Sequence, residues 1–170
     1  DTDHAWGDSG TQSNDLTYAA ASGTTPTEDE FRSAYHAARK AMLQFKNDKG
    51  KLFIRPTVRP LPNLVLLVGP DLEEVANKAI NKQLVSSGET AVVLDKPRIV
   101  TLGGLTDATK FYLLNLGQAL KPFVFQARRP LARQMKGMDD REFKDVKFMT
   151  DARYNLGYLA WWNAVLTTFT

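Results

Sequence analysis

The first residues contain the letters that surround the nucleophilic serine of trypsin-like proteases. The stretch HAWGDSG places His4, Asp8 and Ser9 close together. A serine becomes a nucleophile when a histidine takes its proton and a buried carboxylate orients that histidine. Those proteases carry the motif late, after most of their barrels, and Thr11 stands where they have a second glycine. We therefore rank a small hydrolase as a distant hypothesis and name no catalytic residue.

Three other stretches could carry chemistry, and each has a simpler interpretation. His36 has no second histidine at helical spacing, so we expect a surface histidine and not a metal ligand. The turn VGPDLEE lacks the glycines and the lysine of a phosphate site, so we expect a simple helix start. Asp139 and Asp140 lie in a mixed-charge run typical of a solvated turn. These patterns predict no enzyme, no metal and no cofactor, and a function carried by shape and contact.

Composition sets the outer limits. The chain has 170 residues, 43% hydrophobic and 24% charged, which is enough for one globular domain or two lobes. It has no cysteine, which excludes disulfides and thiolate metal sites and favours a cytoplasmic origin. No apolar run approaches the roughly 20 residues that cross a bilayer, so we expect no membrane partner. A start at Asp1 without methionine suggests a processed product or a fragment.

Charge is distributed unevenly. Residues 1 to 30 contain acids and neither lysine nor arginine, whereas residues 121 to 136 contain bases and no acid. The bases, which we call the basic strip, are Lys121, Arg128, Arg129, Arg133 and Lys136. Such a strip can bind nucleic acid or the acidic surface of a neighbouring chain, and charge alone does not choose between them.

The elements that position these residues begin with a polar segment and a helix. Residues 1 to 26 are polar without an apolar period, which predicts an arm or loop. Thr27 and Glu30 form a capping-box pattern, and a helix should follow that ends near Asn47 to Gly50. Its expected apolar face is Phe31, Ala34, Tyr35, Ala38, Ala41, Met42 and Phe45.

The later part of the chain alternates one helix with several strands. RPTVRPLPN should be an extended linker or edge, LVLLV a buried strand, and Pro70 the start of a second helix. The apolar face of that helix should be Leu72, Val75, Ala76, Ala79, Ile80 and Leu84. Strands are then expected at TAVVLD, RIVTL, KFYLLNL, KPFVFQ and VKFMTDARYNLGYLAWWNAVLTTF. The fold class is therefore α+β, with the late aromatics more typical of core and interface than of base stacking.

Four segments together carry a resemblance to a known family. They are AARKAMLQFKNDKGKLFIRP, LVLLVGPDLEEVANKAI, KPFVFQARRP and VKFMTDARYNLGYLAWWNAV. In their order and approximate spacing, these segments resemble the major head subunit family of Mu-like phages and prophages. The resemblance covers roughly residues 28 to 170. The resemblance implies the Hong Kong 97-like capsid fold, in which a spine helix and long antiparallel strands form a peripheral domain with an inserted axial α/β domain.

The same resemblance implies a domain layout. Residues 1–26 would be a polar arm or loop, 27–50 the spine helix of the peripheral domain, 51–120 the axial domain and 121–170 the return to the peripheral domain. The extended arm and long hairpin loop of such subunits have no clear counterpart, so the chain resembles the later half of a head protein.

The implied function is that of a major capsid protein of a tailed phage or prophage. The partners would be copies of itself in hexamers and pentamers, a scaffold or other head proteins, and packaged DNA bound non-specifically. The location would be the virion, assembled in the bacterial host cytoplasm. The basic strip would then face a neighbouring subunit or the DNA. The main alternative is a basic nucleic-acid-binding module that uses the same strip.

Overall fold

The computed structural model describes residues 6–9, 12–23, 25–54, 61, 63–82, 90, 92–136 and 147–170. The chain divides into two compact units. The first comprises Asp1–Pro122 and Leu159–Thr170, and the second is Phe123–Tyr158. The first unit combines helices with a sheet, and the second is a pair of long strands, so the α+β class is confirmed.

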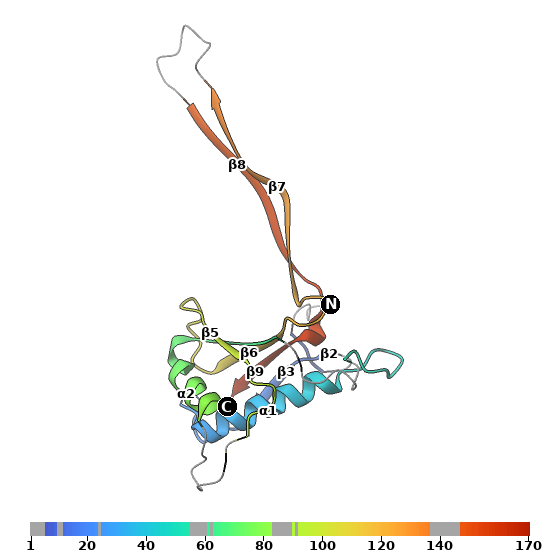
Figure 1. Ribbon diagram of the computed structural model, residues 1–170, viewed down its shortest axis with the longest axis vertical. Coiled ribbons are helices and arrows are strands. Elements are labelled where there is room, and N and C mark those ends of the chain that lie inside the picture. Colours follow the sequence, from blue (N-terminus) through green and yellow to red (C-terminus); the bar gives the residue numbers. More distant parts are fainter. Residues whose placement is uncertain are drawn as a thin grey trace. The chain divides into compact units, whose positions relative to one another are not determined.

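A five-stranded mixed sheet forms the centre of the first unit (Figure 1). In spatial order its strands are β3 (Asp15–Tyr18), β9 (Ala164–Phe169), β6 (Lys110–Asn115), β4 (Leu64–Val68) and β5 (Arg98–Thr101). The outer pairs β3–β9 and β4–β5 are parallel, and the inner pairs β9–β6 and β6–β4 are antiparallel. The last strand of the chain therefore lies inside the sheet, between an early strand and a middle one.

The first helix, α1 (Glu28–Gln44), begins as the sequence predicts. The Thr27 hydroxyl accepts from the Glu30 amide, and the Glu30 carboxylate accepts from the Thr27 amide at 2.7 Å. The helix ends at Gln44, before the expected turn, because Phe45 turns extended and its carbonyl accepts from the Phe53 amide. The turn itself lies beyond the helix, with Gly50 at a φ of +71°.

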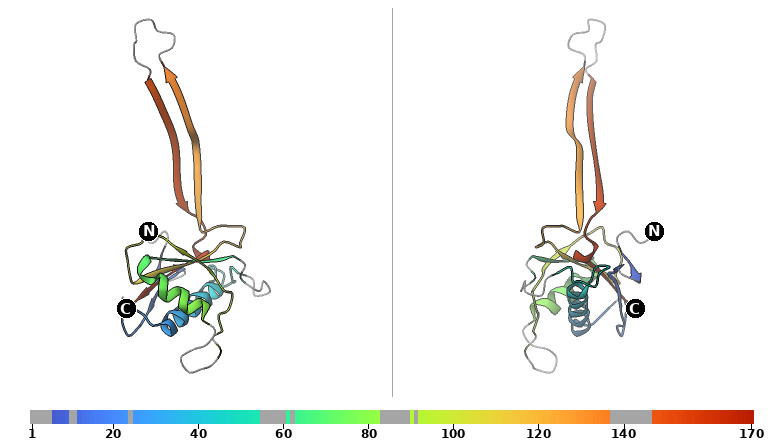
Figure 2. Two further views of the ribbon diagram at one scale, coloured as in Figure 1. Left: turned by 60° about the vertical axis from the view of Figure 1, so that its left-hand side comes forward. Right: turned by 90° about the vertical axis from the view of Figure 1, so that its right-hand side faces the viewer.

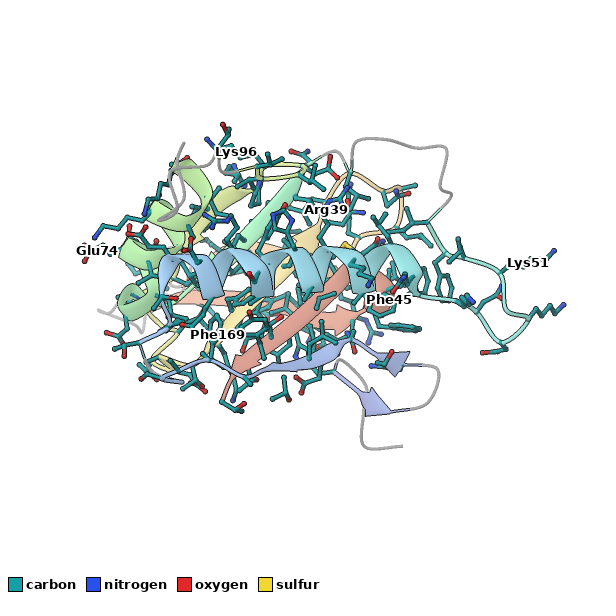
Figure 3. The ribbon with its side chains drawn as sticks, turned by 90° about the horizontal axis from the view of Figure 1, so that it is seen from below. Arg39, Phe45, Lys51, Glu74, Lys96 and Phe169 are labelled. Carbon is teal, nitrogen blue, oxygen red and sulfur yellow. The ribbon has the colours of Figure 1, made fainter. Side chains whose placement is uncertain are left out.

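The second helix, α2 (Pro70–Asn81), connects the parallel strands β4 and β5. Gly69 is its N-cap and Pro70 its first residue, as the sequence predicts. Both helices cover the same face of the sheet (Figures 1 and 3). Figure 3 shows α1 lying across the strands, with Phe45 at its end. The expected apolar faces are thereby confirmed for residues that become fully buried, including Phe31, Tyr35, Met42, Leu72 and Ile80.

The main core lies between these helices and the sheet. Phe31 of α1 contacts Phe111 of β6 and Phe169 of β9, with ring centroids 5.0 and 5.7 Å apart. The opposite face of the sheet is also apolar, since Val65, Leu114 and Ala164 are buried there. β4 therefore alternates between two buried faces, which explains its unbroken apolar sequence.

Residues expected to form an arm or loop contain short strands. β1 (Asp8–Ser9) pairs with β2 (Gln12–Ser13), and β3 adds an edge to the main sheet. The buried Asn14 side chain ties them down, accepting from the Gly7 amide at 2.9 Å and donating to the Ala164 carbonyl at 3.1 Å. Leu16 and Tyr18 pack against the core, and this contact gives the segment its place.

Two strand expectations need correction. TAVVLD forms no strand in its described residues, where Asp95 has a left-handed φ of +49°. The long final stretch is divided into β8 (Lys147–Tyr158) and β9 by a 3-10 turn at Trp161–Asn163. In that turn the Asn163 side chain is buried and donates to the Leu120 carbonyl at 2.9 Å.

The division into two units has other boundaries than those expected for the domains. Helix α1 shares its core with β4, α2 and β6, whereas 27–50 and 51–120 were expected in different domains. The assignment to peripheral and axial domains stays a prediction. Most of RPTVRPLPN, together with Leu84, Asp139 and Asp140, lies outside the described residues. Among the described helices, none is long and apolar enough to cross a membrane.

Candidate assembly surface

The second unit is an antiparallel ribbon of two long strands. β7 (Phe123–Lys136) pairs with β8, from Phe123 opposite Tyr158 to Lys136 opposite Lys147. Both views of Figure 2 show the two strands side by side along their length. At the base, the Leu159 amide donates to the Pro122 carbonyl at 2.9 Å, so the chain leaves and re-enters the first unit at one point.

The ribbon is irregular near its middle. The register shifts between Ala127 and Arg129 and again between Arg129 and Ala132. Pro130 lies in the second interval, and proline has no amide to donate to a neighbouring strand. Extra residues in β7 at these two points, including Arg128, leave the regular pairing and remain exposed.

Above the base, the ribbon has one apolar side. Residues directly opposite each other on antiparallel strands share a face, and alternate residues share it along a strand. The pairs Phe123–Tyr158, Phe125–Leu156 and Ala127–Tyr154 therefore share one face. Ring contacts support this, because the centroids of Phe123 and Tyr158 and those of Phe125 and Tyr154 are each 5.7 Å apart. We call Phe123, Phe125, Tyr154, Leu156 and Tyr158 the apolar face.

The opposite side of the same segment is less apolar, with Val124 as its one large hydrophobic side chain. It carries the pairs Val124–Gly157 and Gln126–Asn155. The pair Arg129–Arg153 continues this alternation along β8 and places two guanidinium groups at neighbouring positions. Arg153 is a cation that the sequence analysis missed, since only pairing across the hairpin brings it to the basic strip.

The basic strip is divided between the two units. Lys121 belongs to the first, where its ammonium donates to the carbonyls of Leu116 and Gln118. Arg129 forms an ion pair with Asp151 of β8. Residues 121–136 contain no acid, but an acid of the partner strand neutralises one member of the strip.

Two members of the basic strip remain available. The side chains of Arg128 and Arg133 are exposed and have no hydrogen-bond or ion-pair partner among the described residues. Lys136 ends β7, and its side chain lies outside what the structure describes. The ribbon therefore offers Arg128, Arg133 and Arg153 as cations for an external partner.

A cluster of titratable side chains lies elsewhere, on α1. The Tyr35 hydroxyl lies 2.8 Å from the Leu94 carbonyl oxygen and 2.6 Å from that of Asp95. Arg39 donates from Nε to the Asp95 carboxylate at 2.7 Å. Burial raises the pKa of Tyr35, and the Asp95 carboxylate adds to that rise while Arg39 opposes it. These groups satisfy one another, so the cluster fixes the segment after residue 92 on α1.

His36 belongs to this cluster and is half-buried, whereas a surface position was expected. Its Nε2 lies 3.1 Å from the Val92 carbonyl oxygen. Burial lowers the pKa of His36, and the charges of Arg39 and Arg32 lower it further. The hydrogen bond to Val92 acts in the opposite direction and raises the pKa. Across the described residues, no group of three or more possible metal ligands occurs. Of the proposed hydrolase residues, Asp8 and Ser9 form β1, and His4 lies outside the described part.

Comparison with known proteins shows similarity in both sequence and fold. The family model described as Mu-like prophage major head subunit gpT matches residues 21–105 and 101–168. No curated protein matches the sequence. The mature capsid of bacteriophage PhiM1 is similar in structure, with 14% identity, a TM-score of 0.56, and coverage of 94% of this chain and 52% of that chain.

The capsid of cyanophage P-SCSP1u is also similar, with 11% identity, a TM-score of 0.54, and coverage of 92% of this chain and 53% of that chain. This chain spans about half the length of these capsid proteins. The fold is that of phage capsid subunits, which confirms the Hong Kong 97-like fold expected from the sequence.

Proposed function

Since this chain belongs to the Mu-like prophage major head subunit family, we propose that it is a structural subunit of the icosahedral shell that encloses phage or prophage DNA. The observation that carries the proposal is the extent of the match. The family model runs through both units, and the PhiM1 capsid covers 94% of the chain. In this function the protein works by association and catalyses no reaction.

The proposed partners follow from that function. Copies of the subunit form hexamers and pentamers, a scaffold or other head proteins assist them, and packaged DNA is bound without sequence preference. The place of work is the virion, after assembly in the bacterial host cytoplasm. Within the subunit we propose that the ribbon belongs to the peripheral domain and that β4, α2, β5 and β6 belong to the axial domain. Helix α1, within residues 27–50, stays proposed as the spine helix of the peripheral domain.

Electron microscopy tests the function. The full-length protein that carries this sequence, expressed with the neighbouring head-assembly genes, should form closed shells of uniform diameter in negative stain. The 170-residue chain alone should remain a monomer or small oligomer, because it spans about half the length of the similar capsid proteins. Failure of the full-length protein to form shells in any combination of these genes would contradict the proposal.

For the basic strip, we propose contact with an acidic surface of a neighbouring subunit. A repeated contact needs a defined register, and opposite charges steer encounter and penalise wrong partners more than they add affinity. Arg128→Glu with Arg133→Glu should therefore block shell formation in the full-length protein while its circular dichroism is unchanged. These two are preferable to Arg129, whose reversal would place a second carboxylate beside Asp151.

The matched control reverses two exposed lysines of the turn in the first unit. Lys49→Glu with Lys51→Glu makes the same change in charge and should leave shells intact. Normal shells from the strip variant that fail to retain DNA would place the strip on the inner wall, as the nucleic-acid alternative requires. Normal shells filled with DNA would leave the strip without a role in assembly.

A further inference from the structure

The apolar face of the ribbon is exposed to a degree unusual for aromatic side chains. The exposed fraction is 62% for Phe125, 68% for Tyr154, 69% for Leu156 and 62% for Tyr158, and 40% for Phe123. No charged residue belongs to this part of the ribbon on either face. Contiguous apolar surface of this kind marks an interaction site.

The ribbon also lacks stabilising neighbours of its own kind. A two-stranded sheet is marginally stable in water, and a third layer or strand is normally needed. Among the described residues, β7 pairs with no strand other than β8, and β8 with none other than β7. A partner that covers the apolar face would supply the missing layer.

The partner that this face fits is the same face of a second copy. An aromatic side chain buries roughly 150–250 Å², so five side chains at these exposures offer on the order of 600 Å² per copy. Two copies would bury about 1,200 Å², the lower end of the range for specific interfaces. The exposed large apolar residues described in the first unit, such as Leu52, Val92 and Leu102, are separated in sequence and less suited to form such a surface.

We infer that two copies of this chain pair through the apolar faces of their ribbons, related by a twofold axis. The two sheets would pack face to face at about 10 Å, with the rings of one copy between those of the other. Arg129 and Arg153, which lie on the opposite side of the ribbon, then face outward on both copies. Because a twofold contact uses the same face of both copies, the association closes at a dimer.

Pairing through the outer edge of β7 is disfavoured by the same structure. The two register shifts and Pro130 interrupt the row of amides that another strand would need. The inferred contact rests on the proposed function only in so far as a shell subunit meets many copies of itself. Its residues are distinct from the basic strip.

Sedimentation of the 170-residue chain at about 50 μM measures this contact. The wild type should be a dimer with a micromolar Kd. Phe125→Lys with Leu156→Lys should give a monomer, with the Kd weakened by roughly 100-fold or more. The matched control is Gln126→Lys with Asn155→Lys, which adds the same charges to the same strands on the opposite face and should keep the dimer.

Cross-linking keeps the inference testable if the lysine variant fails to fold. The chain has no cysteine, so Tyr154→Cys or Leu156→Cys introduces a single thiol on the apolar face. A short bismaleimide should link these variants into covalent dimers and leave Asn155→Cys monomeric. A monomeric wild type, or equal cross-linking of Asn155→Cys, would overturn the inference. Neither result bears on whether the full-length protein forms shells, so the two proposals fail separately.

Discussion

At the scale of single residues, Gly69 is required because of a close approach. Its φ of −75° is open to any residue. A Cβ at this position would lie 2.5 Å from the carbonyl oxygen of Leu105, which is backbone and cannot rotate away. The turn before α2 therefore needs glycine for space, and not for phosphate binding or for an unusual backbone angle.

Gly69→Ala should lower the free energy of unfolding by about 1–3 kcal/mol, the usual cost of overpacking. Urea denaturation followed by circular dichroism measures this. Gly104→Ala is the control, because no atom lies within 4 Å of its Cβ position. Equal midpoints for the two variants would show that the Leu105 backbone can yield at little cost.

His36 should make stability depend on pH. Burial, then Arg39 and Arg32, hold the pKa of His36 below its ordinary value of 6.5 in the folded protein. The unfolded chain therefore binds the proton first as the pH falls. The contribution of this residue to stability is complete above about pH 7 and is lost progressively as the pH falls through the ordinary pKa and toward the folded one.

The expected result is a decline in the free energy of unfolding between about pH 7 and pH 5 that His36→Gln reduces. Denaturant titrations of both proteins across this range measure it. The carboxylates with lowered pKa, Glu30, Glu74 and Asp107, act at lower pH and are common to both proteins. If the free energy of unfolding depended on pH equally in both proteins, His36 would have the same charge in the folded and the unfolded state.

At the scale of elements, the end of α1 tests which of its sides is structural. Phe45 is 6% exposed and contacts Trp161 with ring centroids 5.2 Å apart, whereas the neighbouring Lys46 is exposed. Phe45→Ala should cost on the order of 3–5 kcal/mol in thermal or denaturant unfolding, and Lys46→Ala should be nearly neutral. Similar costs for both would refute the assigned face.

The sequence predicts the elements whose stability depends on local pattern. The capping box of α1, the apolar faces of both helices and the strands β4, β5 and β6 all follow from spacing or apolar content. Elements that depend on distant contacts were missed. β3 exists because its residues pair with β9 near the end of the chain, and the TAVVLD segment is held by Tyr35 instead of forming a strand.

The candidate surface shows the same limit. The arginines of the basic strip are visible in the sequence, and the long strands that carry them could be expected. Their environment depends on register, since only the pairing of β7 with β8 brings Asp151 to Arg129 and Arg153 to the same side. The two register shifts near Pro130 place Arg128 outside the regular alternation, and no short-range pattern gives that offset.

At the scale of the whole molecule, the first unit should fold without the second. The first unit closes its own sheet, because β9 returns after the ribbon to pair with β6 and β3. The ribbon leaves and re-enters through Pro122 and Leu159, whose backbone groups are joined by a hydrogen bond of 2.9 Å. A segment inserted between adjacent points of a folded unit can be removed at small entropic cost.

A variant in which a short Gly-Ser linker replaces residues 123–158 should therefore fold. It should keep the helical circular dichroism of α1 and α2 and unfold in one cooperative transition, with a Tm within about 5 °C of the corresponding transition in the whole chain. Phe45→Ala in this variant should be as costly as in the whole chain, since the Phe45–Trp161 contact lies within the first unit. A shortened protein without a cooperative transition would mean that the core of the first unit depends on the ribbon, contrary to the division drawn from the fold.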